Sequence, residues 1–274
     1  MPELPEVEVI RQGLIPHVVD RQIVSIACSA KKLRMPIPRK ELSLWLKGGR
    51  ISAINRRGKY LIFLLESGAA MIVHLGMTGK LGIFPATAPA ALHDHVVFRL
   101  QDGMQMRYND VRRFGIIRVL TPDQFRENDP FKDMGCEPLE KDFSGSYLKK
   151  MAGRRLQPVK NFLMDNHMVA GIGNIYANEI LFHAGIHPAK PIGFLTLPLW
   201  DTVAEKTREV LLRAIACGGS SISDFVNSSG QKGYFQLELM VYGRAGKGCT
   251  RCSASIERLV IGGRSTFFCP NCQK

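Results

Sequence analysis

The chain has 274 residues and a formal net charge of +13, from 37 lysines and arginines against 24 aspartates and glutamates. This length is enough for one large domain or two ordinary ones, each with its own hydrophobic core. A basic surplus of this size favours a polyanionic partner such as nucleic acid, an acidic membrane surface or an acidic protein, and a solvated surface that aids solubility is the alternative. The surplus is concentrated in residues 31–60, with ten basic residues and one acidic residue, and in residues 241–274, with six and one.

No apolar run approaches the roughly 18 residues that a membrane-spanning helix requires. Acidic residues begin at position 3, where a signal peptide would carry positive charge. The sequence therefore predicts a cytoplasmic protein with no membrane partner and with reduced cysteines. Four of the seven cysteines form a pattern near the C-terminus, and Cys28, Cys136 and Cys217 are interpreted as small buried side chains.

The N-terminal segment has helical periodicity. Val7, Ile10 and Leu14 recur at helical spacing, and Pro5 suits a first helical turn, which predicts a helix over residues 5–15. Asp102-Gly103 is a hairpin signal inside one of five strand-like runs that follow. These runs are RQIVSIAC, KYLIFLL, AMIVHLGM, HVVFRLQDGMQMRY and GIIRVL, and they indicate a two-sheet sandwich or a barrel.

After the strand-like runs, the sequence pattern changes first to a polar stretch and then to a helical region. The stretch PDQFRENDPFKDMGCEPLEKD is polar, contains three prolines and is interpreted as a linker. A helical pattern follows, with a long helix predicted from Leu197 to Cys217 and ended by Gly218-Gly219. Short strands are expected around the C-terminal cysteines. The predicted domains are 1–121, a β-sandwich; 122–142, the linker; 143–234, a helical domain; and 235–274, a cysteine-bearing finger.

The strongest local signal is a metal site. CTRC at Cys249–Cys252 and CPNC at Cys269–Cys272 are two C-x-x-C pairs with sixteen residues between them. Each pair aims two thiolates at one point, and together they complete the tetrahedral S₄ shell that suits Zn²⁺. All four positions are filled by protein, so we predict one structural zinc that stabilises a hairpin too small to bury its own core. A disulfide pair and a redox C-x-x-C are the alternatives.

Two candidate anion-binding sites lie in the C-terminal half of the chain. Between the cysteine pairs, two short strands are predicted to turn at Gly262-Gly263, which places Arg264 at a hairpin tip that suits contact with phosphate. In GIGNIYANEILF, Asn174 is predicted as the N-cap of a helix, and helix N-termini present free N–H groups to phosphate. An ordinary turn from loop to helix is the alternative reading of this second stretch.

Two stretches, HLGMTG at 74–79 and YNDVRRFG at 108–115, are interpreted as loops at strand ends that place large residues beside glycines. Met77 and Phe114 suit core packing, and Arg112 suits a charged surface. The alternative is a wedge, because an enzyme that acts on one DNA base must extrude that base and fill the gap. Composition does not choose between these readings.

The whole chain resembles the formamidopyrimidine-DNA glycosylase family of bacterial base-excision repair enzymes. The resemblance rests on PELPEVE, RRGKYL, HLGMTG, HDH, YNDVRRFG, DNHMVAGIGNIYANEILF, GYFQLELMVYGR and the cysteine pairs with GGRSTFFC, in this order. It implies an α+β fold: an N-terminal β-sandwich domain with an N-terminal helix, a helical domain of helix–two-turns–helix type, and a C-terminal zinc-finger β-hairpin. It further implies a monomer without an obligate protein partner, whose substrate is double-stranded DNA containing oxidised bases.

The resemblance implies a bifunctional DNA glycosylase and AP lyase for oxidised purines, namely 8-oxoguanine and formamidopyrimidines. The family's nucleophile matches the secondary amine of Pro2 after removal of Met1, and an α-amino group titrates at roughly 7.7–8.0. Glu3 matches the general acid that protonates the sugar ring oxygen. Glu6 lies on the same helical face, and helix charge balance is its alternative role. The other matches are Lys59, for proton transfer in β-elimination; Arg264, for phosphate contact and δ-elimination; His93, Arg112, Arg155, Lys160 and Asn174, for DNA-backbone contact; and Met77, Arg112 and Phe114, for filling the void left by the base.

One stretch departs from the family. The loop NSSGQKGYF, at 227–235, corresponds to the part that closes over the damaged base, and Gln231-Lys232 at its tip leaves open which side chains read the lesion. Two alternative functions are also open. An endonuclease VIII-like enzyme for oxidised pyrimidines typically has Gly where Leu4 stands here. A non-catalytic zinc-ribbon DNA-binding protein would leave Pro2-Glu3 and Lys59 unexplained.

Overall fold

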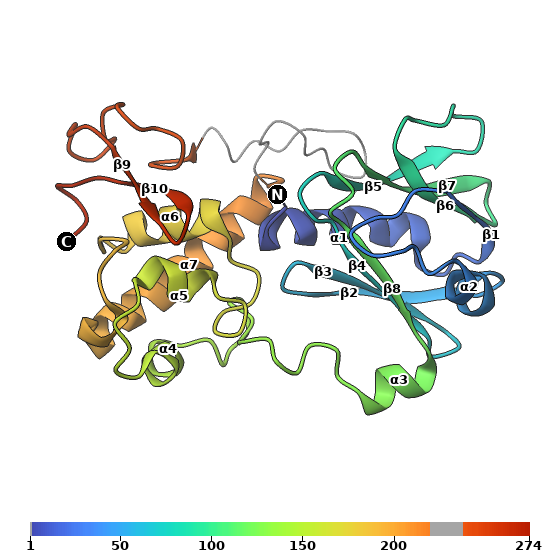
Figure 1. The fold of residues 1–274 in the computed structure, drawn as a ribbon, viewed down its shortest axis with the longest axis horizontal. Helices are drawn as coiled ribbons and strands as arrows, with labels where there is room; N and C mark the ends of the chain where they lie inside the picture. The colour runs from blue at the N-terminus through green and yellow to red at the C-terminus, as the bar shows by residue number, and fades with distance from the viewer. Residues whose placement is uncertain (1, 220–237) are drawn as a thin grey trace. The chain divides into compact units, whose positions relative to one another are not determined.

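The computed structural model describes residues 2–219 and 238–274, so the loop at 227–235 lies outside the described residues (Figure 1). The described chain forms two compact units, one of residues 2–132 with 217–219 and one of residues 133–216 with 238–274. Within these residues no helix combines the length and the apolar character needed to cross a bilayer.

The first unit is a helix, α1 (Leu4–Val18), with two antiparallel four-stranded sheets. One sheet has the order β2-β3-β4-β8 and the other the order β1-β6-β7-β5. The strands of the first sheet are β2 (Ile51–Arg57), β3 (Tyr60–Leu65), β4 (Ala70–His74) and β8 (Ile116–Leu120), and those of the second are β1 (Ile23–Cys28), β5 (Gly79–Pro85), β6 (Asp94–Leu100) and β7 (Met104–Asp110).

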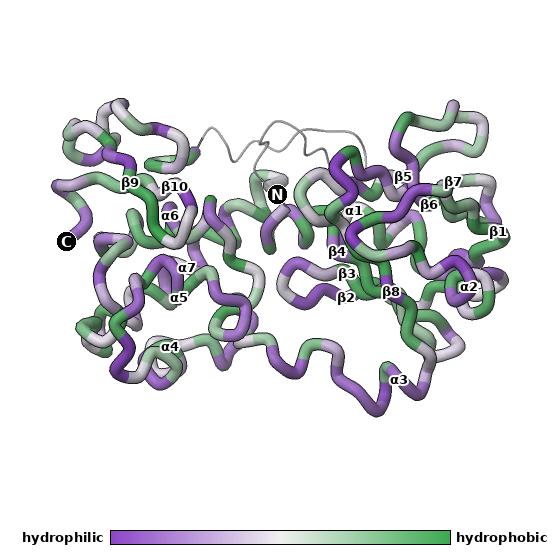
Figure 2. Tube along the Cα trace, in the orientation of Figure 1, coloured by the Kyte–Doolittle hydropathy of each residue, from purple (hydrophilic) through white to green (hydrophobic). Residues whose placement is uncertain are grey.

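The core of this unit is shared by α1 and both sheets. Val7, Ile10 and Leu14 are all 0% exposed, which confirms the predicted apolar face of α1, although the helix continues to Val18. Figure 2 shows hydrophobic residues along β4 and hydrophilic ones at the turn between β2 and β3. The sandwich prediction is therefore confirmed, with its core between the elements that carry the apolar alternation.

Sequence reasoning missed several elements of this unit. Strand β2 was missed because only Ile51 and Ile54 of its seven residues are buried. Strand β5 contains two glycines and ends at Pro85, which weakens its strand signal. A short helical segment, α2 (Arg39–Glu41), leads into a π-helical turn at Leu42–Leu46. Such short elements depend on packing rather than on a local pattern.

Strand pairing sets the positions of the loops. The hairpin predicted at Asp102-Gly103 joins β6 to β7; Gly103 has a φ of +81° and Met104 N donates to Asp102 Oδ1 at 3.0 Å. Gly79 at the start of β5 pairs with Asp110 at the end of β7. The loop that precedes Gly79 and the loop that follows Asp110 therefore leave the sheet side by side.

The segment 122–142, which was interpreted as a linker, contains the helix α3 (Pro122–Glu127). Thr121 caps this helix by accepting a hydrogen bond from Gln124 N, and the Gln124 side chain accepts one from Thr121 N in return. The sequence TPDQ carries this capping box openly. The helix was missed because three prolines and high polarity in this stretch outweighed the cap signal.

The second unit is helical and ends in a hairpin. The long helix α7 runs from Leu197 to Ala216, which confirms the prediction to within one residue. Trp200, on α7, is fully buried with its ring 5.3 Å from that of Phe162. The other elements are α4 (Gly145–Ala152), α5 (Val159–Met164), α6 (Asn174–His183), a 3₁₀ turn (Ile192–Phe194), β9 (Glu257–Ile261) and β10 (Arg264–Phe268).

Candidate active site

The start of α1 places two carboxylates in a buried setting. Glu3 is 2% exposed and Glu6 is 1% exposed, and Glu6 Oε2 accepts a hydrogen bond from Glu3 N at 2.9 Å. Pro2 is buried as well, and Pro5 lies in the first helical turn, where its missing N–H removes no intrahelical bond. Glu6 thus has a structural function at the helix start, while Glu3 is held beside Pro2 in a site away from bulk water.

Lys59 lies half-buried in the turn between β2 and β3. The register pairs Tyr60 with His74 across β3 and β4, and their ring centroids are 4.8 Å apart. Burial, together with the charges of Lys59 and Arg34, lowers the pKa of His74 to about 4. His74 is therefore neutral at pH 7, and its Nδ1 accepts a hydrogen bond from Gly76 N at 3.1 Å.

Sequence reasoning assigned no function to His74. The available signal was its position as the first residue of HLGMTG, next to the loop of a candidate wedge. Its proximity to Lys59 depends on the pairing of β3 with β4, which the sequence alone does not specify. The structure thus adds a neutral imidazole to the surroundings of the candidate catalytic lysine.

Buried Asp110 ties the two candidate wedge loops together. Its side chain is 0% exposed and accepts hydrogen bonds from Thr78 Oγ1 at 2.6 Å and from Gly115 N at 2.8 Å. The hydroxyl of Tyr108 donates to the same carboxylate at 3.3 Å. Thr78 Oγ1 in turn accepts from Arg112 N at 3.0 Å, so one network fixes both loops.

The three candidate wedge side chains project from these fixed loops. Met77 is 39% exposed, Phe114 is 44% exposed, and the Arg112 guanidinium lies 4.7 Å above the Phe114 ring. Gly76 has a φ of +66°, and a Cβ on it would lie 2.5 Å from the Phe114 carbonyl carbon, so the loops touch backbone to backbone. This exposure disagrees with core packing of Met77 and Phe114 and agrees with the wedge reading.

His93 is the last residue of a loop whose backbone is hydrogen-bonded by the buried Arg107. The residue is half-buried and adopts a φ of +73°. Arg107, 4% exposed, donates to Pro89 O at 2.7 Å and pairs with Asp94 at 3.4 Å. Asn109 Nδ2 donates to Leu92 O at 2.9 Å. These bonds fix the backbone on both sides of His93, which a phosphate contact from this position would require.

In the second unit, Lys160 and Asn174 both reach the finger strand β10. Lys160 is 0% exposed, and its Nζ donates to Thr266 Oγ1 at 2.7 Å and to Ser265 O at 3.2 Å. Asn174 Nδ2 donates to the same Ser265 O at 3.0 Å. Its buried Oδ1 has no hydrogen-bond partner within the described residues. Arg155 is exposed, and its guanidinium donates to the carbonyls of Ala152 and Met151 at the end of α4.

The prediction that Asn174 is an N-cap is wrong. The cap position is Gly173, and Asn174 is the first residue inside α6. The Asn174 side chain faces β10 instead, because its amide donates to the Ser265 carbonyl. The sequence could not show this competing partner, since Ser265 is 91 positions away.

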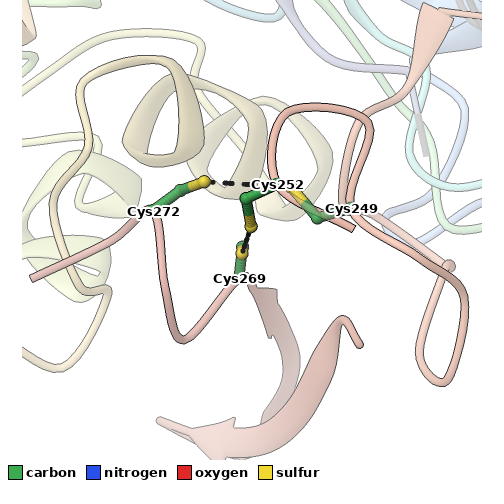
Figure 3. A group of neighbouring side chains, drawn as sticks. All are labelled: Cys249, Cys252, Cys269 and Cys272. Carbon is green, nitrogen blue, oxygen red and sulfur yellow. Dashed lines mark hydrogen bonds between the residues drawn. The ribbon is translucent and has the colours of Figure 1, made fainter. Parts of the chain in front are cut away.

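The four C-terminal cysteines converge, as Figure 3 shows. Their Sγ atoms all lie within 4.8 Å of one another, with 3.9 Å from Cys249 to Cys272 and 3.4 Å from Cys252 to Cys269. A disulfide would bring two sulfurs to about 2.05 Å, and a tetrahedral zinc site with bonds of about 2.3 Å places sulfurs about 3.8 Å apart. The cluster fits zinc and does not fit the disulfide alternative.

Without a cation, the surroundings of the cluster disfavour ionisation of its thiols. Burial and hydrogen bonds from the other three thiols raise the pKa of Cys272 to about 12. Four thiolates would repel one another at these distances, and a Zn²⁺ ion among them removes that cost. Because four protein ligands complete the tetrahedral shell, the metal is structural. The remaining cysteines, Cys28, Cys136 and Cys217, are half-buried rather than fully buried as predicted.

Side chains of α6 hold the finger in place. Glu179 is 1% exposed and accepts backbone hydrogen bonds from Met240, Val241 and Tyr242 at 2.8, 3.0 and 2.8 Å. Burial raises the pKa of Glu179, and these three hydrogen bonds act in the opposite direction. Asn178 Oδ1 accepts from Phe267 N at 2.7 Å. Sequence reasoning missed both residues, although polar residues in the middle of a largely apolar helix were a usable signal.

Arg264 occupies the position predicted for it. Gly262 and Gly263 form the turn between β9 and β10, with φ values of +56° and +71°. Arg264 begins β10 and is exposed. A Cβ on Gly262 would lie 2.9 Å from the Asn161 amide, so this turn also approaches α5 closely.

Three family models match successive parts of the chain. Residues 1–117 match the formamidopyrimidine-DNA glycosylase N-terminal domain, residues 134–226 match the H2TH domain of the same enzymes, and residues 246–274 match the zinc finger found in FPG and IleRS. The chain belongs to the formamidopyrimidine-DNA glycosylase family. The α+β fold class, the finger and its structural zinc are thereby confirmed.

Individual members of the family are similar over their whole length. Formamidopyrimidine-DNA glycosylase of Marinobacter nauticus is 44% identical over 274 residues, which is 100% of both chains. A Lactococcus lactis Fpg mutant in complex with Fapy-dG-containing DNA is 37% identical with a TM-score of 0.92, over 100% of both chains. Wild-type Lactococcus lactis Fpg in complex with DNA containing an oxidised pyrimidine is 36% identical with a TM-score of 0.89, also over 100% of both chains.

The low pKa of His74 gives a pH dependence of stability. Between pH 6.5 and about 4, the unfolded chain binds a proton on His74 that the folded chain does not, so the free energy of unfolding should fall as the pH falls through this window. The difference between 6.5 and about 4 corresponds to at most about 3 kcal/mol. Urea unfolding of His74→Gln should show a flatter pH dependence, and His17→Gln, at an exposed position of α1, should not. Equal slopes for wild type and His74→Gln would contradict the assignment.

Loss of one zinc ligand should release the metal and weaken DNA binding by the finger. Wild-type protein should contain about one zinc per chain, and Cys249→Ser should lose the metal and bind DNA more weakly because Arg264 is no longer held in place. Metal analysis and DNA titration check both effects, with Cys28→Ser on β1 as the matched control. Full activity of the metal-free protein on DNA would contradict a role of the finger in substrate binding.

Proposed function

We propose that this DNA glycosylase for oxidised lesions also cleaves the DNA strand at the lesion, by β,δ-elimination through a Schiff base on the Pro2 amine. Its preferred substrates are oxidised purines, namely 8-oxoguanine and formamidopyrimidines. The observation that carries the proposal is the start of α1, where Pro2 is buried directly before Glu3, which is 2% exposed. A buried carboxylate beside an N-terminal secondary amine supplies an acid and a nucleophile at one place.

The chemistry needs an amine with a free lone pair. Removal of Met1 converts the Pro2 nitrogen from an amide into a secondary amine, which attacks C1′ of the damaged nucleotide while the C1′–base bond breaks. Glu3 donates a proton to the sugar ring oxygen, so the ring opens and an iminium forms. The iminium acidifies the C2′ hydrogen, and its loss expels the 3′ phosphate by β-elimination. Lys59 transfers protons in this step, and Arg264 contacts phosphate and assists the second, δ-elimination.

The remaining residues grip and open the DNA. His93, Arg112, Arg155 and Asn174 contact the DNA backbone, and Arg155 is exposed as such a contact requires. Lys160 contributes through β10, because its ammonium is buried against Thr266 and Ser265. Met77, Arg112 and Phe114 replace the extruded base, which costs a few kcal/mol to unstack. The surplus of basic residues attracts the duplex through counterion release.

The domain division that we propose assigns residues 1–121 to catalysis, 122–142 to a linker that includes α3, 143–234 to the helix–two-turns–helix domain and 235–274 to the zinc finger. The protein acts as a monomer without an obligate protein partner, in the cytoplasm and on the nucleoid when it is bound to DNA.

Borohydride trapping tests the nucleophile. The protein is incubated with duplexes that contain 8-oxoguanine opposite cytosine or one oxidised pyrimidine, and the adduct is mapped by peptide analysis. We expect a covalent adduct on Pro2, formed faster with 8-oxoguanine. Protein that retains Met1 should bind DNA but form no adduct, since its Pro2 nitrogen is an amide. Glu3→Gln should bind and excise poorly, because an amide does not donate a proton as a carboxylic acid does.

An adduct that maps to Lys59, or base release without any adduct, would contradict the mechanism. Faster trapping on the oxidised pyrimidine would instead assign the endonuclease VIII-like preference. Binding of DNA without base release from either lesion would instead assign the function of a non-catalytic DNA-binding protein. These outcomes separate the three functions that the sequence left open.

Arg112 should matter more for opening the duplex than for chemistry. Arg112→Ala should lose most single-turnover activity on a paired 8-oxoguanine and discriminate less by opposite base, because the guanidinium donors no longer pair with the base left behind. On an abasic site, where no base is extruded, the loss should be smaller. Arg118→Ala, which removes an exposed charge from β8, is the control. Equal losses of Arg112→Ala on both substrates would assign Arg112 to phosphate binding or folding instead.

A further inference from the structure

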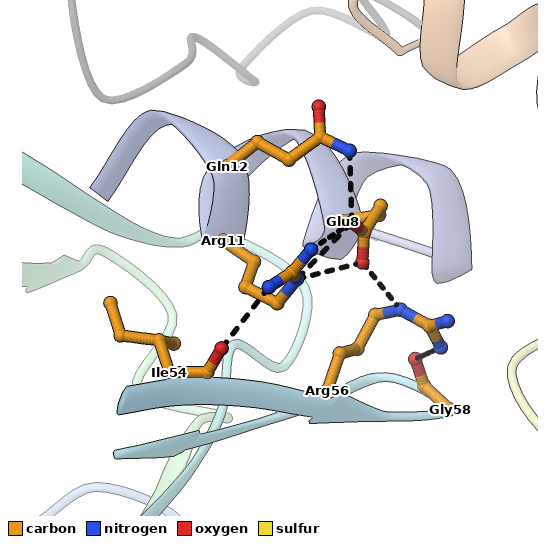
Figure 4. A network of polar contacts seen from close by, with 6 residues as sticks. All are labelled: Glu8, Arg11, Gln12, Ile54, Arg56 and Gly58. Atoms are coloured by element: carbon orange, nitrogen blue, oxygen red, sulfur yellow. Dashed lines mark hydrogen bonds and ion pairs between the residues drawn. The ribbon is translucent and has the colours of Figure 1, made fainter. Parts of the chain in front are cut away.

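Glu8, in the second turn of α1, lies between two arginines in a largely buried network (Figure 4). The Glu8 carboxylate accepts from Arg56 Nε at 3.0 Å and from Arg11 Nη2 at 2.7 Å. The side chains of Glu8 and Arg56 are 11% and 10% exposed, and that of Arg11 is 26% exposed. Charges this far from water are weakly screened, so the pair resists separation.

The two arginines lead to different places. Arg11 Nη1 donates to Ile54 O, inside strand β2, at 3.2 Å. Arg56 Nη1 donates to Gly58 O, in the turn between β2 and β3, at 3.1 Å. Gly58 is the residue before Lys59. Of the two arginines, Arg56 therefore connects the Glu8 carboxylate with the turn that carries the candidate catalytic lysine.

The carboxylate that anchors this connection is ionised. Burial by itself would raise the pKa of Glu8, but hydrogen bonds from Arg11, Gln12 and Arg56 outweigh it and lower the pKa. Gln12 Nε2 donates at 2.9 Å. With donors from α1 and from β2 on one carboxylate, the network has a fixed charge at its centre and is present across the neutral pH range.

We propose that Arg56 is a positioning residue for Lys59, which holds the β2–β3 turn at a fixed distance from the catalytic start of α1. Gly58 adopts a φ of +54°. Because glycine has no side chain that limits its backbone angles, the hydrogen bond from Arg56 to its carbonyl restrains the turn. Lysine has four flexible side-chain bonds, and small displacements of a reacting group are costly in rate. The inference rests on the proposed function of Lys59.

A double-mutant cycle tests the coupling. Arg56→Met, Lys59→Met and their combination are compared in single-turnover assays of base release from 8-oxoguanine and of strand cleavage at an abasic site. We expect Arg56→Met to slow the step that Lys59→Met slows most, by tenfold or more. Because Arg56 acts through Lys59, the double variant should fall within threefold of Lys59→Met alone.

Arg11→Met is the matched control, since it removes a guanidinium from the same carboxylate and leaves the Gly58 contact intact. It should change both rates by less than threefold, and its effect should multiply with that of Lys59→Met. Arg56→Lys keeps the charge but cannot hold Glu8 and Gly58 O with one planar fork, so it should give an intermediate rate. Circular dichroism and melting temperature report the folding of each variant.

Multiplicative losses for Arg56→Met and Lys59→Met would overturn the proposal, as would equal effects of Arg56→Met and Arg11→Met, or a Lys59→Met variant with wild-type rates on both substrates. If Arg56→Met does not fold, a wild-type rate for Arg56→Lys would overturn it and a rate lowered at the step sensitive to Lys59 would sustain it. Failure of the proposed function is a separate outcome, because wild-type protein would then release no base and cleave no strand.

Discussion

A carboxylate that leaves water must be surrounded by donors, and this cost shapes three places in the protein. Asp110 gathers a threonine hydroxyl and a backbone N–H from two loops. Glu179 collects three successive N–H groups at the entry to the finger. Glu8 is satisfied by arginines from a helix and a strand. In each case the acid joins segments that carry exposed groups or groups that we propose to be catalytic, so satisfying the charge also fixes their geometry.

This use of acids affects the charge of the surface. The chain has only 24 acidic residues, and Glu3, Glu6, Asp110 and Glu179 are each at most 2% exposed. Acids placed inside leave the exposed surface richer in positive charge than composition alone indicates.

Local pattern was sufficient for some elements and insufficient for others. Helix α7, the Asp102-Gly103 turn and the cysteine pairs were predictable because apolar period, turn chemistry and ligand spacing are properties of neighbouring residues. Strand β2 has too few buried apolar residues to produce a recognisable strand pattern. Asn174 and Lys160 were recognised as polar groups of interest, but their shared partner Ser265 is distant in sequence. The pairing of β5 with β7, which joins the wedge loops, is likewise a tertiary property.

The docking of the finger on α5 and α6 has a consequence for variation. Glu179 binds N–H groups of residues 240–242, Asn178 binds the N–H of Phe267, and Asn174 and Lys160 bind the carbonyl of Ser265. These are main-chain atoms, which every residue except proline offers alike. The helical side of this junction is thus constrained in sequence. On the finger side, Thr266 is constrained as well, because its hydroxyl accepts a hydrogen bond from Lys160, while the residues that contribute only main-chain atoms can change their side chains. Related enzymes can therefore vary many side chains of the finger over a framework that stays the same.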